Sequence, residues 1–327
     1  MAILGTAAGL RLRPYAGEAD LAEIVRLLNA EAAADGLVRR VTVEQLAVTY
    51  AHSNESFDAA RDVTIVEVDG QVVAMAEREA VDTTDGHREY RLDGAVDPAW
   101  RRRGIGRAVL AESERIARER ASAEAPASPI LGSWSWESQP GDRALLEAAG
   151  FTVARWFFDM VRPTLDDVDE VRLPGGLEIR PIDASLARAV WDAGVDAFED
   201  HWGGFDHSEV SFRRWLDAPR TDLSLSIVAF DGAEIAGGVI NSIDDDQNAE
   251  LGVNRGWLNI VFTRRAWRRR GLATALVARS LEELRARGMS SAALGVDADN
   301  PHDALGLYER LGFAVDQRAA AWRKPLA

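Results

Sequence analysis

An arginine-rich turn occurs twice in the sequence, and its residue types suit the binding of a phosphate. The first copy reads Arg101-Arg102-Arg103-Gly104-Ile105-Gly106, and the second reads Arg268-Arg269-Arg270-Gly271-Leu272-Ala273. Each copy lies between an expected strand and an expected long helix, whose first N–H groups are unpaired and carry a partial positive charge. Small residues let the backbone approach a phosphate, and arginines add charge-assisted hydrogen bonds. The pattern therefore predicts an anion cradle in each copy.

A solvated arginine run is the simpler interpretation of such a turn. Three cations at the start of a helix oppose the helix dipole, however, and the run recurs at the same place in a repeated pattern. The formal net charge of the chain is −15, so binding of an anion has to come from a local cluster of this kind. No Gly-Lys-Ser/Thr follows either turn, and the longer glycine pattern of dinucleotide-binding domains is missing, which excludes both of those phosphate sites.

Both turns resemble the acetyl-CoA signature of the GNAT acyltransferases, which is Arg-x-x-Gly-x-Gly/Ala between a strand and a long helix. The second copy continues with Asn300 and with Leu307-Tyr308-Glu309-Arg310-Leu311-Gly312-Phe313, an ending similar to the last signature motif of that family. The resemblance covers nearly the whole chain, and the two-copy layout is similar to that of the mycothiol synthases. It implies two tandem GNAT-like acyl-CoA N-acyltransferase domains. It also implies direct transfer of an acetyl group from acetyl-CoA to an amine of a small molecule or peptide.

The resemblance further implies how the second copy would hold acetyl-CoA. Backbone N–H groups of the turn, aided by its arginines, would bind the pyrophosphate, and an N–H of the preceding strand would polarise the thioester carbonyl. Asn300 would either bind the pantetheine arm or order its own loop. The expected cofactor-binding residues of the second copy are Val261, Phe262, Thr263, Arg268, Arg269, Arg270, Gly271, Leu272, Ala273, Thr274 and Asn300.

Tyr308 matches the tyrosine that in this family protonates or hydrogen-bonds the departing thiolate. An unperturbed phenol has a pKa near ~10 and a thiol one near ~8.5, so the transfer is uphill by only about 2 kcal/mol.

The general base is left open. Many relatives place a carboxylate early in the strand before the turn, whereas this chain has Asn259 nearby, which could only order a water. Glu199, Asp200, His201 and Asp206 lie in the segment that lines the acceptor side in the family. His201 is the best base among them by its ordinary pKa, although His201-Trp202-Gly203-Gly204 fits a structural turn equally well. The expected catalytic residues are therefore Tyr308, His201 and Asn259.

The first copy lacks the tyrosine. When the copies are aligned through Gly150-Phe151 and Gly312-Phe313, Tyr308 falls on Leu146 and Asn300 falls on Ser138. Because leucine cannot donate a proton, we expect this copy to be a non-catalytic partner, packed with the second copy as a pseudo-dimer within a monomer. It could still bind the cofactor through Arg101, Arg103, Gly104 and Gly106.

The elements that position these residues also occur twice, in one order. Each copy begins with a strand and a helix, continues with an Asp-Gly hairpin, and ends with strand, Arg turn, long helix, strand, short helix and last strand. This order predicts an α/β chain with a mixed α+β sheet in each copy. The expected bounds are 1–164 for the N-terminal domain, 165–176 for an acidic linker ending in Pro174-Gly175-Gly176, and 177–327 for the catalytic domain.

Composition excludes several other classes of protein. The 327 residues contain no cysteine, which removes disulfides and a cysteine nucleophile, and the five histidines show no metal-ligand spacing, so we expect no metal. The negative charge and the absence of an apolar run of about 18 residues predict no nucleic-acid partner and no membrane, and hence a cytoplasmic protein. The alternative to an acetyltransferase is a CoA-binding sensor or scaffold without turnover, and the presence of Tyr308 favours the enzyme.

Overall fold

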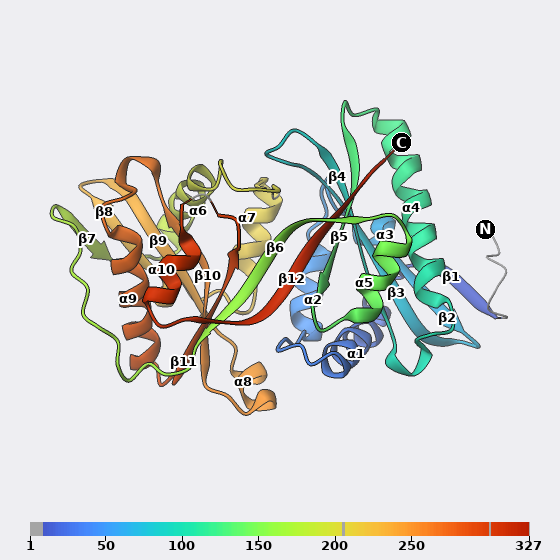
Figure 1. The fold of residues 1–327 in the computed structure, drawn as a ribbon, viewed down its shortest axis with the longest axis horizontal. Coiled ribbons are helices and arrows are strands. Elements are labelled where there is room, and N and C mark those ends of the chain that lie inside the picture. Colours follow the sequence, from blue (N-terminus) through green and yellow to red (C-terminus); the bar gives the residue numbers. More distant parts are fainter. Residues whose placement is uncertain (1–8, 205–206, 301, 327) are drawn as a thin grey trace. The chain divides into compact units, whose positions relative to one another are not determined.

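The computed structural model describes residues 9–204, 207–300 and 302–326, and the chain divides into two compact units (Figure 1). Unit 1 comprises Met1–Arg155, Trp202–Arg214 and Ala319–Ala327, and unit 2 comprises Trp156–His201 and Trp215–Arg318. In the described part of the chain, no helix is both long and apolar enough to cross a membrane.

Unit 1 contains a mixed sheet in which all neighbouring strands are antiparallel except one parallel pair, β4 and β5. In spatial order its strands are β1 (Leu10–Pro14), β2 (Val63–Val68), β3 (Gln71–Asp82), β4 (Arg88–Val96), β5 (Pro129–Trp136) and the end of β12 (Ala314–Pro325). Its helices are α1 (Glu18–Ala34), α2 (Val43–Ala51), α3 (Ala59–Asp62), α4 (Ile105–Glu124) and α5 (Pro140–Ala148).

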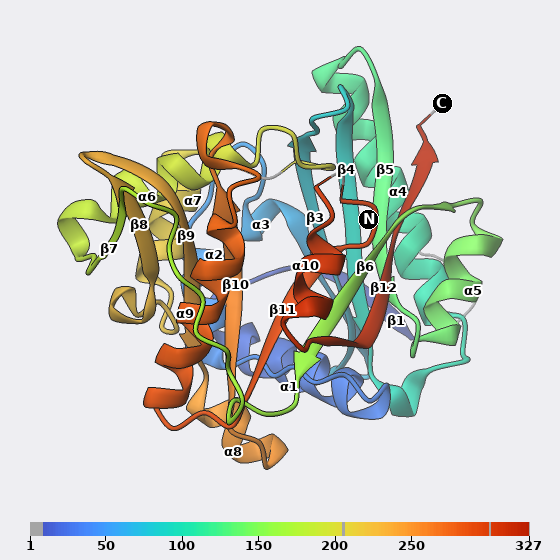
Figure 2. The same ribbon diagram turned by 60° about the vertical axis from the view of Figure 1, so that its left-hand side comes forward.

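Unit 2 repeats this order, again with one parallel pair, β10 and β11. Its strands are β7 (Leu177–Arg180), β8 (Ile227–Asp231), β9 (Glu234–Ile243), β10 (Arg255–Thr263), β11 (Ser291–Asp297) and most of β6 (Thr152–Arg162). The helices of the second repeat are α6 (Ala184–Ala197), α7 (Glu209–Asp217), α8 (Asp245–Leu251), α9 (Leu272–Ala286) and α10 (Ala304–Arg310). Figure 2 shows α9 and α10 with the strands of this sheet.

The last strand of each sequence repeat pairs with a strand of the other repeat. Residues 157–162 of β6 pair with β11, and residues 319–325 of β12 pair with β5 (Figure 1). The compact units therefore do not coincide with the ranges 1–164 and 177–327, which remain our proposed bounds for the sequence repeats. The stretch 165–176 contains no helix or strand, yet Leu165 is buried and packs against the core of unit 2 with Val168 and Leu173.

Each sheet is covered on both faces, which explains the apolar spacing of the helices. In unit 2, Leu276 and Leu281 of α9 pack against Ala229 of β8, while Val190 of α6 packs on the opposite face against Val228. Unit 1 has the same arrangement, with α4 on one face and α1 and α2 on the other. The prediction of a mixed α+β sheet in two copies is confirmed.

The two predicted hairpins are confirmed as β2–β3 and β8–β9. Their turns are Asp69-Gly70 and Asp231-Gly232, and both Asp69 and Gly70 have positive φ, at 50° and 81°. Asp and Gly tolerate this left-handed conformation, so the local sequence determines where each hairpin turns.

Candidate active site

Strands β10 and β11 separate at the centre of the sheet of unit 2. They are paired from Arg255 to Leu258 of β10 only, while β11 continues to Asp297 along β6. Within the described residues, the edge of β10 from residue 259 to residue 263 therefore has no strand partner on the β11 side. This free edge leaves backbone N–H and C=O groups available to a ligand.

A β-bulge lies at the point of separation. The register of β10 against β9 shifts between Leu258 and Ile260, so Asn259 is the extra residue. A bulge bends its strand and changes the direction of neighbouring side chains, and bulges are frequent next to active sites. In unit 1, β4 runs against β3 without a register shift from Arg88 to Val96. The two units therefore differ at the point where the family would place the reacting groups.

The Arg turns have the same backbone conformation in both units. Arg102 and Gly104 have positive φ values of 64° and 82°, and Arg269 and Gly271 have values of 61° and 80°. Such alternation of left-handed and right-handed residues directs successive N–H groups toward one side, which forms an anion-binding concavity. Gly271 immediately precedes α9, so the concavity is continuous with the N-terminus of that helix.

Arg268 binds other parts of unit 2 with its guanidinium. It donates to the carbonyls of Thr263 at 3.1 Å and of Ala197 at 2.9 Å, and it contacts the His302 ring at 3.1 Å and Asp200 at 3.3 Å. Its contacts hold the turn against the end of α6 and against the loop before α10.

Arg101 does the same in unit 1. Its guanidinium donates to both carboxylate oxygens of Asp35, at 2.6 and 2.8 Å, and to the carbonyl of Val96 at 3.4 Å. By contrast, no partner is recorded for the side chains of Arg269 and Arg270 among the described residues, and both are exposed. These two arginines are therefore available for an external anion.

Thr263 ends the free edge of β10 and carries a polar atom without a partner. Its Oγ1 is buried and forms no hydrogen bond with the described residues. A free strand edge, an unpaired buried hydroxyl and an anion concavity next to each other fit the pantetheine and pyrophosphate of acetyl-CoA. The features belong to the predicted residues 261–263 and 268–274, whose individual contacts with a ligand remain predictions.

Tyr308 lies on α10, which follows β11. The side chain is 6% exposed and belongs to the apolar cluster that contains Leu272, at the start of α9, and Val296, on the separated part of β11. Its ring meets Phe313 edge-on at 6.0 Å between ring centroids. The hydroxyl has no recorded hydrogen bond within the described residues. Burial raises the pKa of Tyr308 above its ordinary value, so the phenol stays protonated near neutral pH and gives up its proton less readily than an exposed phenol does.

Leu146 stands in the place of Tyr308 in unit 1. The amide of Phe151 donates to the carbonyl of Leu146 at 3.0 Å, and the amide of Phe313 donates to the carbonyl of Tyr308 at the same distance. Gly150 and Gly312, between these residues, both have positive φ, at 86° and 81°. The two helix ends thus have the same geometry, and only one of them presents a hydroxyl.

The side chains of Asn259 and Asn300 both form hydrogen bonds with other residues of the chain. The Asn259 amide donates to Ser242 Oγ at 2.7 Å, which links the bulge of β10 to β9. The Asn300 side-chain oxygen accepts from the amide of His302 at 2.9 Å, an interaction that orders the loop before α10. Ser242 and His302 were not among the predicted site residues. A polar residue two positions after Asn300 was the only available signal for His302.

His201 lies just beyond α6, and its ring meets Phe198 edge-on at 5.3 Å between centroids. Its neighbour Asp200 accepts hydrogen bonds from Arg265 and Arg268, which lower the pKa of this carboxyl. A carboxylate with a lowered pKa is a weak base, so Asp200 fits a structural ion pair. Asp206 lies outside the described residues.

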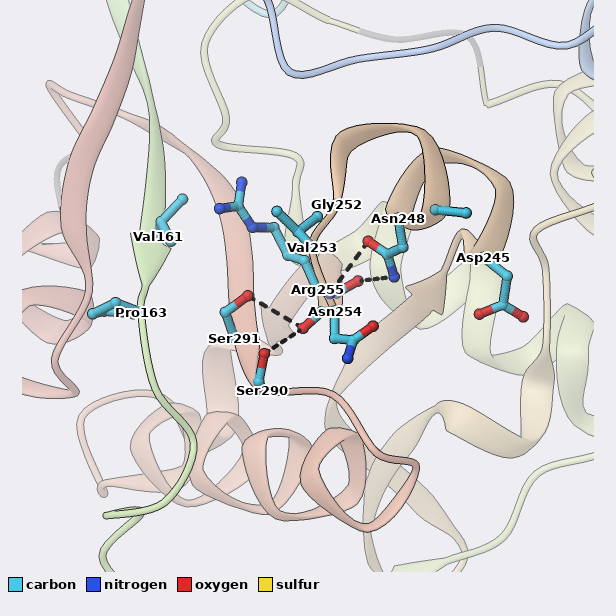
Figure 3. A pocket seen from close by; sticks show the side chains of 11 residues that line it. Val161, Pro163, Asp245, Asn248, Gly252, Val253, Asn254, Arg255, Ser290 and Ser291 are labelled. Carbon is cyan, nitrogen blue, oxygen red and sulfur yellow. Dashed lines mark hydrogen bonds between the residues drawn. The ribbon is translucent and has the colours of Figure 1, made fainter.

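A hollow of about 640 Å³ lies at the other end of β10 and β11, away from the Arg turn (Figure 3). Hydrogen bonds within it tie the turn before β10 to β11. Asn248 binds the backbone of Arg255, and the hydroxyls of Ser290 and Ser291 donate to the carbonyl of Asn254. Figure 3 shows these bonds, which indicate that the hollow's polar groups brace the turn.

A separated parallel strand pair beside a helix N-terminus that is suited to bind an anion is the arrangement expected of an acyl-CoA-dependent transferase. A model of the acetyltransferase (GNAT) family matches residues 25–127 and 188–313. The chain therefore belongs to the GNAT family, and it is an acetyltransferase that moves an acetyl group from acetyl-CoA to an amine.

Curated relatives cover most of the chain. A mycothiol acetyltransferase of Geodermatophilus obscurus is 28% identical over 320 residues, which span 94% of this chain and 94% of that protein. A second, from Clavibacter michiganensis subsp. michiganensis, is 34% identical over 241 residues, or 71% and 72% of the two chains.

Solved structures share the two-copy fold. A GCN5-related N-acetyltransferase from Sphaerobacter thermophilus has 26% identity and a TM-score of 0.69, with coverage of 97% of this chain and 96% of that one. A tandem GNAT protein from the clavulanic acid biosynthesis pathway has 19% identity, a TM-score of 0.70 and coverage of 97% and 99%, and shows the fold alone.

Proposed function

We propose that the second repeat carries out acetyl transfer and that the acceptor is the desacetyl precursor of mycothiol. The observation that carries the first part is an asymmetry between the repeats. The bulge at Asn259 and the hydroxyl of Tyr308 occur in the second repeat only, since β4 is regular and Leu146 replaces the tyrosine. The second part rests on two relatives named mycothiol acetyltransferase, whose matches span 94% and 71% of this chain.

Acetyl-CoA supplies an activated thioester when it is bound. The N–H groups around Arg269 and Gly271 bind its pyrophosphate, with Arg269 and Arg270 as additional donors. The N–H groups of residues 261–263 that point away from β9 polarise the thioester carbonyl. Because no strand pairs with this edge, these donors need no rearrangement before they act.

Tyr308 holds a proton for the departing sulfur. For an unperturbed phenol, proton transfer to the thiolate costs about 2 kcal/mol, and the burial of Tyr308 raises this cost. Tyr308 therefore acts first as a hydrogen-bond donor to the sulfur, which stabilises the developing negative charge in the transition state. The amine acceptor needs a base, for which His201 remains the proposed group and Asn259 the residue that orders a water or holds the bulge.

The test uses the full chain, acetyl-CoA and a set of amines. Release of the CoA thiol measures the rate. The kcat/KM for desacetyl mycothiol should be at least about tenfold higher than for aminoglycosides, polyamines or free amino acids. Equal rates with all amines would reject the proposed acceptor and leave the acetyltransferase intact. Wild-type rates in Tyr308→Phe would reject Tyr308 as the proton donor and leave the assignment of the catalytic repeat to the comparison of the two Arg turns.

A further inference from the structure

The guanidinium of Arg268 joins three segments of unit 2 at one point. It donates to the carbonyl of Thr263, at the end of β10, and to the carbonyl of Ala197, the last residue of α6. Its Nη1 lies 3.1 Å from Nε2 of His302, in the loop that precedes α10. Because a guanidinium has donors only, Nε2 of His302 has to be the acceptor of this hydrogen bond. The imidazole is therefore neutral in this arrangement, with its proton on Nδ1.

Unit 1 has the same junction, made from different side chains. Arg101 donates to the carbonyl of Val96, at the end of β4, and to both carboxylate oxygens of Asp35, the residue at the C-terminus of α1. The side-chain amide of Gln139, just before α5, donates to the same carboxylate at 3.1 Å. The loop before the short helix is thus attached to the Arg turn in both repeats, through a carboxylate and an amide in unit 1 and through a histidine in unit 2. Of these side-chain types, only histidine ordinarily changes its charge between about pH 5 and 8.

The helix that carries Tyr308 depends on contacts outside itself. α10 has only 7 residues, and Asp303, which precedes it, makes no capping side-chain hydrogen bond within the described residues. Helices of this length are not stable alone, so tertiary contacts hold α10 in place. Apolar packing holds its body, and the hydrogen bond of His302 to Arg268 holds the loop at its start. The amide of His302 also donates to the Asn300 side chain at 2.9 Å, which fixes the loop's own conformation.

We propose that His302 is a positioning residue of the second repeat: its neutral imidazole fixes the loop before α10 to the Arg turn and thereby fixes Tyr308 with respect to the thioester of acetyl-CoA. The inference rests on the proposed function, in which Tyr308 donates to the departing sulfur. Protonation of His302 puts a hydrogen on Nε2, so that two donors face each other and the hydrogen bond from Arg268 is lost. Acid pH therefore lowers the rate by a route that does not involve the general base.

The other charged groups around His302 come from the Arg turn, from the segment after α6 and from α10. They are Arg268, Arg265 just before the turn, Asp200 beyond α6, and Asp303 and Arg310 at the two ends of α10. Each carboxylate among them is paired with an arginine. Carboxylates and guanidinium groups ordinarily stay charged between about pH 5.5 and 8, so the histidine is the group whose charge changes at this junction.

The experiment measures kcat of the full chain with an accepted amine between about pH 5.5 and 8, the range in which histidine titrates. The side-chain oxygen of glutamine accepts a hydrogen bond and does not titrate, so His302→Gln should keep the kcat of wild type at about pH 8. His302→Ala should lose about fivefold there, as expected for one hydrogen bond. On acidification, kcat of wild type should fall about fivefold more than that of His302→Gln, because the fall due to the general base is common to both. His87→Gln, which changes a histidine of the β3–β4 turn in unit 1, is the matched control and should follow wild type at every pH.

Combination with Tyr308→Phe shows whether His302 acts through the tyrosine. In the Tyr308→Phe background, His302→Ala should change kcat by less than about twofold, because no hydroxyl is left to position. The same fivefold loss in both backgrounds would overturn the positioning role, because the two effects would then be independent. An equal fall of kcat on acidification in wild type and in His302→Gln would overturn it as well. Thermal unfolding of each variant shows that it is folded.

Hydrogen exchange of the α10 amides provides a readout that does not depend on the proposed function. At about pH 8 exchange should be faster in His302→Ala than in wild type or His302→Gln, because the start of the helix is released. Wild-type rates in Tyr308→Phe would reject the donor role of Tyr308 and leave this difference in exchange in place. Unchanged exchange in His302→Ala would show that apolar packing alone holds α10 and would overturn the inference itself.

Discussion

Leu146 and Tyr308 occupy the same position in the two repeats. Each lies two residues before the last residue of its helix, α5 or α10, and its carbonyl accepts a hydrogen bond of 3.0 Å from the amide of the following phenylalanine, Phe151 or Phe313. Both side chains are buried, at 4% and 6% exposure. The cluster around Tyr308 is apolar, so packing alone would account for a phenylalanine there as well as for the tyrosine. At this position the two repeats differ in a hydroxyl group, and removal of that group tests whether catalysis by the second repeat depends on it.

Tyr308→Phe should lower kcat by roughly 10²–10⁴, the usual range for one positioned proton donor, with little change in acetyl-CoA affinity. Thiol release with an accepted amine measures kcat, and calorimetry measures the affinity. Leu146→Ala is the matched control and should lower the free energy of unfolding by about 2–5 kcal/mol without a comparable loss of kcat per folded molecule. A Tyr308→Phe enzyme within about threefold of wild type would show that the tyrosine serves packing alone.

The glycines of the two Arg turns, Gly104 and Gly271, can be substituted in parallel, because the substitutions strain the backbone to the same extent. Gly104 and Gly271 have φ values of 82° and 80°, so any other residue is strained equally at both. Gly271→Glu should abolish acetyl-CoA binding to the second repeat, because the new carboxylate lies against the pyrophosphate position. Gly104→Glu should leave turnover largely intact. Loss of activity in Gly104→Glu, with an unchanged melting profile, would reverse the assignment of the catalytic repeat.

Arg268 and Arg269 are adjacent and should behave differently. Arg269→Ala should raise the KM for acetyl-CoA about tenfold or more and leave the melting temperature unchanged, because this exposed side chain has no recorded partner in the described residues. Arg268→Ala should lower the melting temperature, because it removes the bonds to Thr263 and Ala197. Steady-state kinetics and thermal unfolding distinguish these effects. The reverse pattern would show that Arg268 is the phosphate ligand.

The role of Asn259 can be tested by parallel substitution of Asn259 and of Ser242, its hydrogen-bond partner. If Asn259 serves to hold the bulge, Asn259→Ala and Ser242→Ala should lower kcat by the same factor, on the order of fivefold for one hydrogen bond of about 1 kcal/mol. If Asn259 orders a water at the acceptor amine, only Asn259→Ala should raise the KM for the amine. Parallel kinetics of the two variants decide between these roles.

Glu77 of β3, which lies opposite Asp93 of β4, should make the stability of unit 1 depend on pH. Burial raises the folded-state pKa of Glu77 from 4.5 to about 7, so the folded chain holds a proton that the unfolded chain has lost between these values. The contribution to stability is complete below about pH 4.5 and disappears as the pH rises through about 7, with a magnitude of at most about 3 kcal/mol. Glu77→Gln should therefore raise the stability of unit 1 at about pH 8 and change it little at about pH 4. Hydrogen exchange of β3 and β4 amides measures this, and a variant whose pH dependence equals that of wild type would contradict it.

The sequence determined the local parts of this protein. The Asp-Gly turns fix both hairpins, because the glycine of each turn, Gly70 or Gly232, adopts a left-handed backbone without strain. The glycine and arginine spacing fixes the turn before each long helix, whose conformation is the same at Gly104 and Gly271. The substitution of Leu146 for Tyr308 could also be predicted, since a single alignment of the two Gly-Phe endings places the two residues together.

Tertiary structure decided the features that arise when strands distant in sequence pair with each other. The bulge at Asn259 exists only in the register of β10 against β9, and no local feature of the sequence indicates a one-residue shift. The exchange of β6 and β12 follows from which sheet edge each strand finds, and strand composition does not encode that choice. For the same reason, the sequence does not show that the Arg268 guanidinium donates to the carbonyl of Ala197, because the end of α6 lies 71 residues away along the chain. Glu77 and Asp93 are ordinary strand residues until the pairing of β3 and β4 sets two carboxylates against each other in a cavity.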